Sequence, residues 1–277
     1  GEHVVGGNYN TAIGFKAFEG SEGNTTADNN TAVGYHALKV CTTGYQNVAV
    51  GENALSANTT GFVNVAIGAE ALDANTSGDN NVAIGKGALS ANTTADNNIG
   101  IGWDALLANT TGTYNIAIGS AALYTNTTGG ESVAIGYNAL NKSTGGYNVA
   151  IGYASQYDCT TGVNNVSAGH NSLQNLTTGN QNSAIGGNSL NACTTGAYNQ
   201  AMGYTAGSAI TTGEYNVAIG HQTGDTLTTG NNCACVGATA DVSASGAVHQ
   251  NVFGNKTSNG DNTFSVKFDD EDFDEFM

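Results

Sequence analysis

The sequence predicts an all-β solenoid, in which the chain winds repeatedly through short parallel strands and turns. First, a motif of 17 residues recurs along nearly the whole chain. Second, each copy contains one short run of β-forming residues, flanked by Gly, Asn and Thr, which favour turns. Third, the chain has 40 Gly, no Pro and only 10% charged residues, a composition atypical of a globular enzyme and of a disordered chain.

The spacing of one glycine defines the repeat. The Gly of Ala-Ile-Gly recurs in steps of 20 residues, then six of 17, one of 16 and six of 17. Twelve of the fourteen steps are therefore identical, which establishes the period. These glycines are Gly14, Gly34, Gly51, Gly68, Gly85, Gly102, Gly119, Gly136, Gly152, Gly169, Gly186, Gly203, Gly220, Gly237 and Gly254.

Each unit reads Asn-Val-Ala-Ile-Gly-x-x-Ala-Leu-x-x-Asn-Thr-Thr-Gly-x-x, and residues 64–80 are a good copy. Residues 65–67 predict a strand, and Gly68 predicts a corner that a Cβ atom would obstruct. The Ala-Leu pair at 71–72 predicts a second short strand, and residues 75–78 predict the return turn. Two strands and two turns would complete one coil.

Stacked coils predict ladders of identical side chains. Neighbouring coils should lie about 4.8 Å apart, the spacing of hydrogen-bonded strands. The residue before the strand is Asn in twelve of the fifteen units, which predicts a ladder of hydrogen-bonded amides. Examples are Asn47, Asn64, Asn81, Asn98 and Asn115.

The strand pattern predicts that one chain alone is incomplete. Side chains alternate between the two faces of a strand, so Val65 and Ile67 face one way and Ala66 the other. Both faces are apolar, as in strands covered on both sides. The narrow lumen can hold the Ala side chain, so the Val and Ile face should contact another copy of the chain. The pattern leaves the number of copies open.

The unit Asn-x-Ala-Ile-Gly-x-x-Ala resembles the repeat of YadA-like trimeric autotransporter adhesin heads. It is still more similar to the Asn-Thr-Ala-Ile-Gly arrays of phage tail fibres and bacterial surface fibres, as residues 11–14, 31–34 and 37–38 illustrate. The resemblance covers about residues 7 to 255, although the unit is longer than that of the adhesin heads. It implies a left-handed parallel β-roll and a homotrimer whose rolls contact one another around a three-fold axis.

Three segments follow from this pattern. Residues 1–237 form the predicted repeat array, and residues 238–263, where the motif decays, are predicted to be capping repeats. Residues 264–277 form an acidic tail rich in Phe. The tail is either a docking peptide for a partner or a segment that lies on its own trimer or frays. The candidate docking residues are Phe268, Phe273 and Phe276.

The residue after the corner glycine varies and is often aromatic or His. Aromatic side chains with a polar edge, exposed in a row, suit contacts with sugars or proteins. The alternative is that they cover neighbouring subunits or simply favour β structure. The candidate receptor contacts are Trp103, Tyr137, Tyr153, His170, Tyr204 and His221.

No residue pattern predicts catalysis, a metal site or a cofactor. Cys41, Cys159 and Cys193 replace the Asn of Asn-Thr-Thr, and Cys233 and Cys235 replace the strand Asn and Ala. Scattered cysteines of odd number predict small buried residues and no disulfides. The net charge of −16 argues against nucleic acid as a partner. The absence of any 18-residue apolar stretch argues against membrane insertion.

The sequence therefore predicts a structural fibre protein of a phage tail, virion or bacterial surface, and not an enzyme. Its expected location is extracellular or in the virion. The expected partners are copies of itself, other fibre or virion proteins and a host-surface glycan. One alternative is an ice- or crystal-binding solenoid that uses a Thr ladder, although adjacent Thr residues of an extended segment face opposite ways. That ladder would include Thr59-Thr60, Thr110-Thr111 and Thr127-Thr128. Another alternative, a polysaccharide lyase or hydrolase, would need clustered acids that the repeats do not contain.

Overall fold

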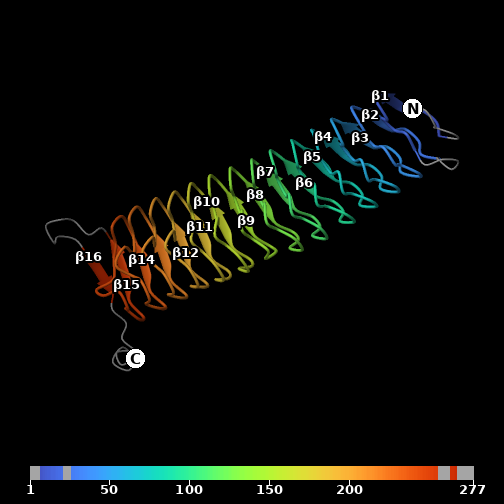
Figure 1. Cartoon of the computed structure of the whole chain (residues 1–277). Coiled ribbons are helices and arrows are strands. Elements are labelled where there is room, and N and C mark those ends of the chain that lie inside the picture. The colour runs from blue at the N-terminus through green and yellow to red at the C-terminus, as the bar shows by residue number, and fades with distance from the viewer. Residues whose placement is uncertain (1–6, 21–25, 255–262, 267–277) are drawn as a thin grey trace. The chain divides into compact units, whose positions relative to one another are not determined.

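The computed structural model describes residues 7–20 and 26–254, together with the backbone of residues 263–266. Within these residues the regular structure is entirely β, without a helix, and the strands follow one another in chain order (Figure 1). The chain divides into two compact units, residues 1–145 and 146–277, and each is described separately. The predicted parallel β-solenoid with 17-residue coils is confirmed in both.

The first unit is a parallel sheet in which each strand pairs with the same positions of the next coil. Val65, Ala66 and Ile67, for example, pair with Val82, Ala83 and Ile84. Every strand has three residues because turns occupy the rest of each coil. The strands are β1 (Thr11–Ile13), β2 (Thr31–Val33), β3 (Val48–Val50), β4 (Val65–Ile67), β5 (Val82–Ile84), β6 (Ile99–Ile101), β7 (Ile116–Ile118) and β8 (Val133–Ile135).

The second unit repeats this arrangement and ends differently. Its first seven strands pair in parallel, whereas the last strand, β16, runs antiparallel to β15 and places Phe264 opposite Phe253. The change of direction ends the parallel stack. The strands are β9 (Val149–Ile151), β10 (Val166–Ala168), β11 (Ser183–Ile185), β12 (Gln200–Met202), β13 (Val217–Ile219), β14 (Ala234–Val236), β15 (Asn251–Gly254) and β16 (Thr263–Val266).

The corner after each strand depends on glycine. Gly68 has a φ of 138°, and an added Cβ atom would lie 2.5 Å from the carbonyl oxygen of Gly85 in the next coil. The prediction of a second strand at Ala71-Leu72 is wrong, since these residues lie in turns. Positive φ values at Glu70 (58°) and Leu72 (54°) interrupt the extended backbone. The N–H of Leu72 still donates to the carbonyl of Ala88, so the turns also form a ladder.

The core is a set of columns inside the coils. Ala66, Ala71, Leu72, Asn75 and Asn81 are all fully buried, and the same positions are buried in most other coils. Burial of two small apolar residues and one Leu per coil supplies the hydrophobic contribution. The two Asn residues supply hydrogen bonds to buried backbone groups.

One region of the second unit's core is polar. Gln156 occupies the usual Leu position and is fully buried. Its Nε2 donates to the carbonyl of Val149 (2.9 Å) and to Oγ of Ser167 (2.8 Å). Its Oε1 has no hydrogen-bond partner, and Ser155 and Ser167 stand nearby where other coils have Ala. This cluster leaves one buried acceptor unsatisfied.

Candidate functional site

The Asn residue before each strand forms the predicted ladder. Asn81 accepts from the backbone N–H of Asn98 in the next coil (2.9 Å). Its Nδ2 donates to Oδ1 of Asn64 (3.2 Å) and to the carbonyl of Ala95 (2.8 Å). Each amide thus joins two neighbouring coils and connects the strand to the turn of its own coil. The ladder holds the strand in place and is buried, so it is structural.

A second amide ladder runs through the Asn of Asn-Thr-Thr in the first unit, and the sequence analysis missed it. Asn92 Nδ2 donates to Oδ1 of Asn75 (3.1 Å) and to the carbonyl of Ala95 (3.0 Å). The fixed spacing of this Asn in the repeat was the available signal. The Asn-Thr-Thr triplets match the acceptor pattern for N-glycosylation, but their Asn side chains are buried inside the fold.

The cysteines occupy the predicted positions in this core. All five are buried and free of disulfides. Cys193 replaces the Asn of Asn-Thr-Thr, and its Sγ lies 3.6 Å from the carbonyl of Gly196 as a weak donor. Burial raises the pKa of the Cys193 thiol to about 12 and that of Cys41 to about 11. A neutral, enclosed thiol of this kind is a packing residue.

The outer face of most strands is apolar and partly exposed. In β7, Ala117 is fully buried while Ile118 is 37% exposed, and in β13 Ala218 is buried while Ile219 is 41% exposed. The same alternation recurs along both sheets. Each unit therefore presents a row of Val and Ile side chains to its surroundings. A contiguous apolar row of this kind is typical of an interaction surface.

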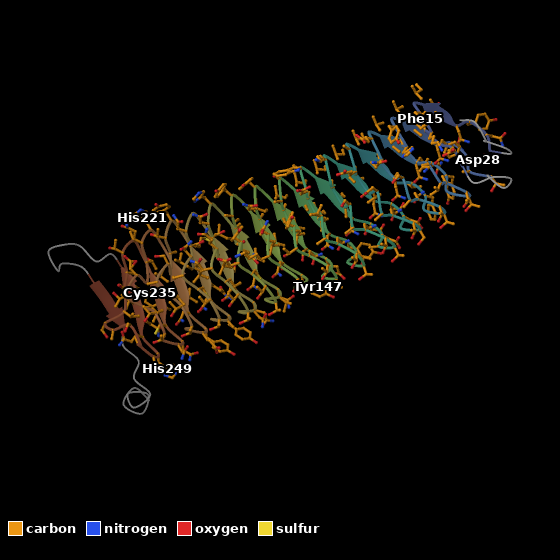
Figure 2. The ribbon with its side chains drawn as sticks, in the orientation of Figure 1. Phe15, Asp28, Tyr147, His221, Cys235 and His249 are labelled. Carbon is orange, nitrogen blue, oxygen red and sulfur yellow. The ribbon has the colours of Figure 1, made fainter. Side chains whose placement is uncertain are left out.

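Two rows of variable residues flank this outer face. We call the residue after the corner glycine the trailing row and the residue before the ladder Asn the leading row. In the second unit, His221 of the trailing row and Tyr147 of the leading row lie at opposite edges of the ribbon (Figure 2). The trailing row there comprises Tyr153, His170, Gly187, Tyr204, His221 and Ala238, and the leading row comprises Tyr147, Asn164, Gln181, Tyr198, Tyr215 and Asn232.

All the candidate receptor contacts belong to the trailing row and are exposed. The structure brings some of them together in pairs. The rings of Tyr153 and His170 stack with centroids 5.1 Å apart, and those of Tyr204 and His221 with centroids 5.7 Å apart. Tyr137 occupies the same position in the first unit. Face-to-face stacking covers the inner ring faces, so these pairs present mainly ring edges outward.

Trp103 differs from the stacked pairs. It is 60% exposed, and the trailing-row residues of the coils on either side are Lys86 and Ser120. No aromatic residue of the same row therefore lies against either face of its indole. A ring with free faces can stack on a sugar, whereas a ring within a stack offers chiefly its edge.

The aromatic residues of the leading row were missed by the sequence analysis. Tyr198 and Tyr215 stack with ring centroids 4.6 Å apart and planes 2° apart. Both have positive φ values (59° and 58°), a backbone conformation that favours Gly and Asn. Their constant position before the ladder Asn was the available signal. Val63 and Glu131 hold the same position in other coils with positive φ values, so this backbone conformation does not by itself require an aromatic ring.

The Thr ladder is only partly available to a ligand. The Oγ1 of Thr59 donates to the carbonyl of Thr76 in the next coil (3.0 Å). The Oγ1 of Thr110 donates in the same way to the carbonyl of Thr127 (3.0 Å). The second Thr of each pair is exposed. Because one hydroxyl of each pair is engaged within the solenoid, a single column of free hydroxyls is left. One column disfavours the flat array that ice or crystal recognition would use.

The described residues contain no group of three or more His, Cys, Asp or Glu that could hold a metal ion. Nor does any helix long and apolar enough to cross a membrane occur in that part of the chain. The candidate docking residues Phe268, Phe273 and Phe276 lie outside the described residues.

Comparison with protein-family models, with curated proteins and with solved structures finds no match to this chain. The functional argument therefore depends on the geometry of the solenoid and its outer surfaces.

Proposed function

We propose that this protein is a structural fibre protein that assembles as a homo-oligomer. The observation that carries the proposal is the partly exposed Val and Ile row on the outer face of the strands. The best arrangement is a left-handed roll with three copies around a common axis, in which each copy covers the apolar face of the next. Such a rod would serve as the shaft or head of a fibre on a phage tail, virion or bacterial surface. Its location would be extracellular or in the virion, with other fibre or virion proteins as partners.

The internal organisation of the coils supports a mechanical role. Backbone ladders, two amide ladders in the first unit and Thr hydroxyl bonds all connect each coil to the next. These bonds resist separation of neighbouring coils. Among the described residues, buried side chains fill the inside of the coils. The residues that repeat thus serve the solenoid itself.

Replacing Ile118 with Asp tests the assembly. Ile118 is partly exposed in the isolated chain, so a charge there should be tolerated by the coil but not by a covered apolar contact. We expect Ile118→Asp to keep the β-rich circular dichroism spectrum and to sediment as a monomer, while the unchanged protein sediments as an oligomer.

Thr128→Asp is the matched control, because Thr128 is an exposed turn residue of the same coil, outside the outer strand face and both flanking rows. It should assemble normally. A stable folded monomer of 27.8 kDa for the unchanged chain would overturn the proposed function.

Receptor adhesion is the second candidate function, favoured by Trp103. Its 60% exposure and non-aromatic row neighbours leave the indole faces available for stacking on a glycan. We expect Trp103→Ser to keep the fibre assembled and to weaken binding on a glycan array or to host cells. The combined change of Tyr137, Tyr153 and His170 to Ser tests the rest of the row. Unchanged binding by both variants would exclude the trailing row as a receptor site.

A further inference from the structure

The outer face of the second unit raises a problem of register for any assembly. Its central positions are similar in most coils, as Val149, Val166 and Val217 illustrate, although Ser183 and Gln200 interrupt this column. Two copies in contact through these positions could slide by one coil, about 4.8 Å, and keep most of the apolar contacts. A repeated surface therefore supplies affinity but does not specify one alignment. The alignment must come from positions that differ between coils.

The two flanking rows differ more between coils than the central positions do. Tyr198 and Tyr215 lie in the leading row, and Tyr204 and His221 lie in the trailing row of the same two coils. The four rings bracket the outer faces of β12 and β13, where Met202 is 52% exposed. Each row pairs its own rings by stacking, at 4.6 Å and 5.7 Å between centroids. The most aromatic part of this face is therefore confined to two neighbouring coils.

The occupant that best suits this face is a second copy of the chain. A partner must match a surface that repeats at every coil, and another copy has the same period. Each chain carries a net charge of −16, so copies repel one another unless they meet through an uncharged surface. From β9 to β14, the outer strand face and both rows contain no Asp, Glu, Lys or Arg.

Cyclic symmetry determines which rows meet. Around a rotation axis parallel to the stack, contacts are head-to-tail, so the leading row of one copy meets the trailing row of the next. The two rows of one coil are six residues apart, which corresponds to about 1.7 Å of rise when 17 residues rise about 4.8 Å. The same coil of the neighbouring copy is therefore the nearest in height. A two-fold axis perpendicular to the stack would instead bring each row onto itself.

We propose that Tyr198 and Tyr215 of one copy contact Tyr204 and His221 of the next, and that this aromatic contact fixes the axial register of the assembly. In the aligned register each Tyr meets a ring. A shift of one coil in one direction places Tyr198 against Gly187, and a shift in the other direction places Tyr215 against Ala238. Either shift loses one of the two aromatic pairs. The proposal rests on the proposed assembly and assigns Tyr204 and His221, with Tyr153 and His170 of the same row, to the subunit contact in place of a receptor role.

Disulfide trapping tests the contact directly. The variant carrying Tyr198→Cys and Tyr204→Cys has both thiols on exposed positions of one coil, with β12 between them. A link within one chain is excluded, because the three extended residues of β12 between the two positions already span on the order of 10 Å and a disulfide needs Cα atoms within about 7 Å. The native cysteines are buried and cannot compete. Mild oxidation should therefore join neighbouring copies and yield covalent oligomers on a non-reducing gel.

Three matched variants report the wrong arrangements. Asn164→Cys with Tyr153→Cys and Asn164→Cys with Gly187→Cys report shifts of one coil, and Asn164→Cys alone reports contact about a two-fold axis perpendicular to the stack. All three leave the four rings in place. We expect at least five-fold less covalent product from each than from the aligned pair Asn164→Cys with His170→Cys. A larger yield from any of them would overturn the aligned register.

The outcomes separate this inference from the proposed function. Sedimentation is measured first, without oxidation. A monomeric protein would overturn the assembly itself, and with it this contact. An oligomer that gives no cross-link through Tyr198→Cys and Tyr204→Cys would overturn the aromatic contact alone.

A second measurement tests the register without cysteine at the contact. Tyr198→Asn and Tyr215→Asn introduce the residue found at Asn164 and Asn232, which suits the positive φ of this row. The reporter pair Asn164→Cys and His170→Cys is placed two coils away. We expect the oligomer to persist while the reporter cross-link falls at least two-fold as shifted alignments appear. An unchanged reporter yield would show that these tyrosines do not determine the register.

Discussion

Removing one amide from the ladder before the strands should destabilise the first unit strongly. We choose Asn81→Ala, because every bond of this side chain is defined. Its Oδ1 accepts from the N–H of Asn98 (2.9 Å), and its Nδ2 donates to the carbonyl of Ala95 (2.8 Å) and to Asn64 (3.2 Å). Asn64 keeps a donor after the change, since the backbone N–H of residue 81 still reaches its Oδ1 (2.9 Å).

The magnitude follows from the group left without a partner. The buried N–H of Asn98 would lose its bond to the side chain, whereas the carbonyl of Ala95 keeps a donor in Asn92 Nδ2 (3.0 Å). One unsatisfied buried group costs about 1–3 kcal/mol, so the change should cost about 1–3 kcal/mol. This is a considerable share of the roughly 5–15 kcal/mol that stabilises a typical domain.

The assay should resolve local effects, because each coil of a solenoid contacts mainly its neighbours. Hydrogen exchange followed by mass spectrometry should show faster exchange in the peptide covering residues 82–101 than in distant coils. Asn80→Gly is the control, because Asn80 is exposed and its φ of 58° suits glycine. Equal protection in the two variants, or a loss below about 0.5 kcal/mol for Asn81→Ala, would refute the assignment of the ladder as a stabilising element.

Two further predictions concern the core. Changing Ser155 and Ser167 to Ala together with Gln156 to Leu restores the usual repeat and removes the unsatisfied Oε1. In urea titrations this triple change should raise the free energy of unfolding by about 1–3 kcal/mol. A loss of stability would show that the polar cluster is favourable. Burial raises the pKa of Cys193 from 9.0 to about 12, so its contribution to stability is complete below pH 9 and declines as the pH rises from 9 toward 12. The folded protein should accordingly leave a disulfide thiol reagent unreacted at pH 8, and the urea-unfolded protein should react with it; rapid reaction of the folded protein would contradict this burial.

The period of the sequence predicted the strands because strand position depends on a local pattern that recurs in every coil. Val65–Ile67 is a strand as expected, and Gly68 turns the chain where a Cβ atom would collide with the next coil. The first amide ladder followed from the same recurrence. The regular part of the fold was therefore readable from one unit and its spacing.

The sequence did not predict the conformation of Ala71-Leu72. Leu has no preference for positive φ, so local propensity favours an extended segment there. The structure instead places Leu72 at a φ of 54°, fully buried, with its N–H bonded to Ala88 of the next coil. Contacts between coils determine this backbone, and one unit alone does not display them.

The candidate surfaces were only partly predictable for a related reason. The trailing row was identified because aromatic residues recur there, but its stacking in pairs depends on ring orientation. The leading row was missed because Tyr198 and Tyr215 stand among Asn and Gln residues that suit a turn equally well. The two rows flank the same apolar face, and this arrangement is a property of the folded coils that one sequence unit does not display.

Recurrence and variation carry different information in this chain. Ala218 lies in the lumen and contacts the equivalent positions of neighbouring coils, so every coil is constrained to a similar small residue. Tyr215 and His221 face outward from the same coil, and the stack does not constrain their identity. The coil itself therefore does not explain the choice of an aromatic residue at either position. In a repeat protein of this kind, departures from the motif on exposed positions are therefore the better guide to contacts with other molecules, while the motif itself reports how the coils hold together.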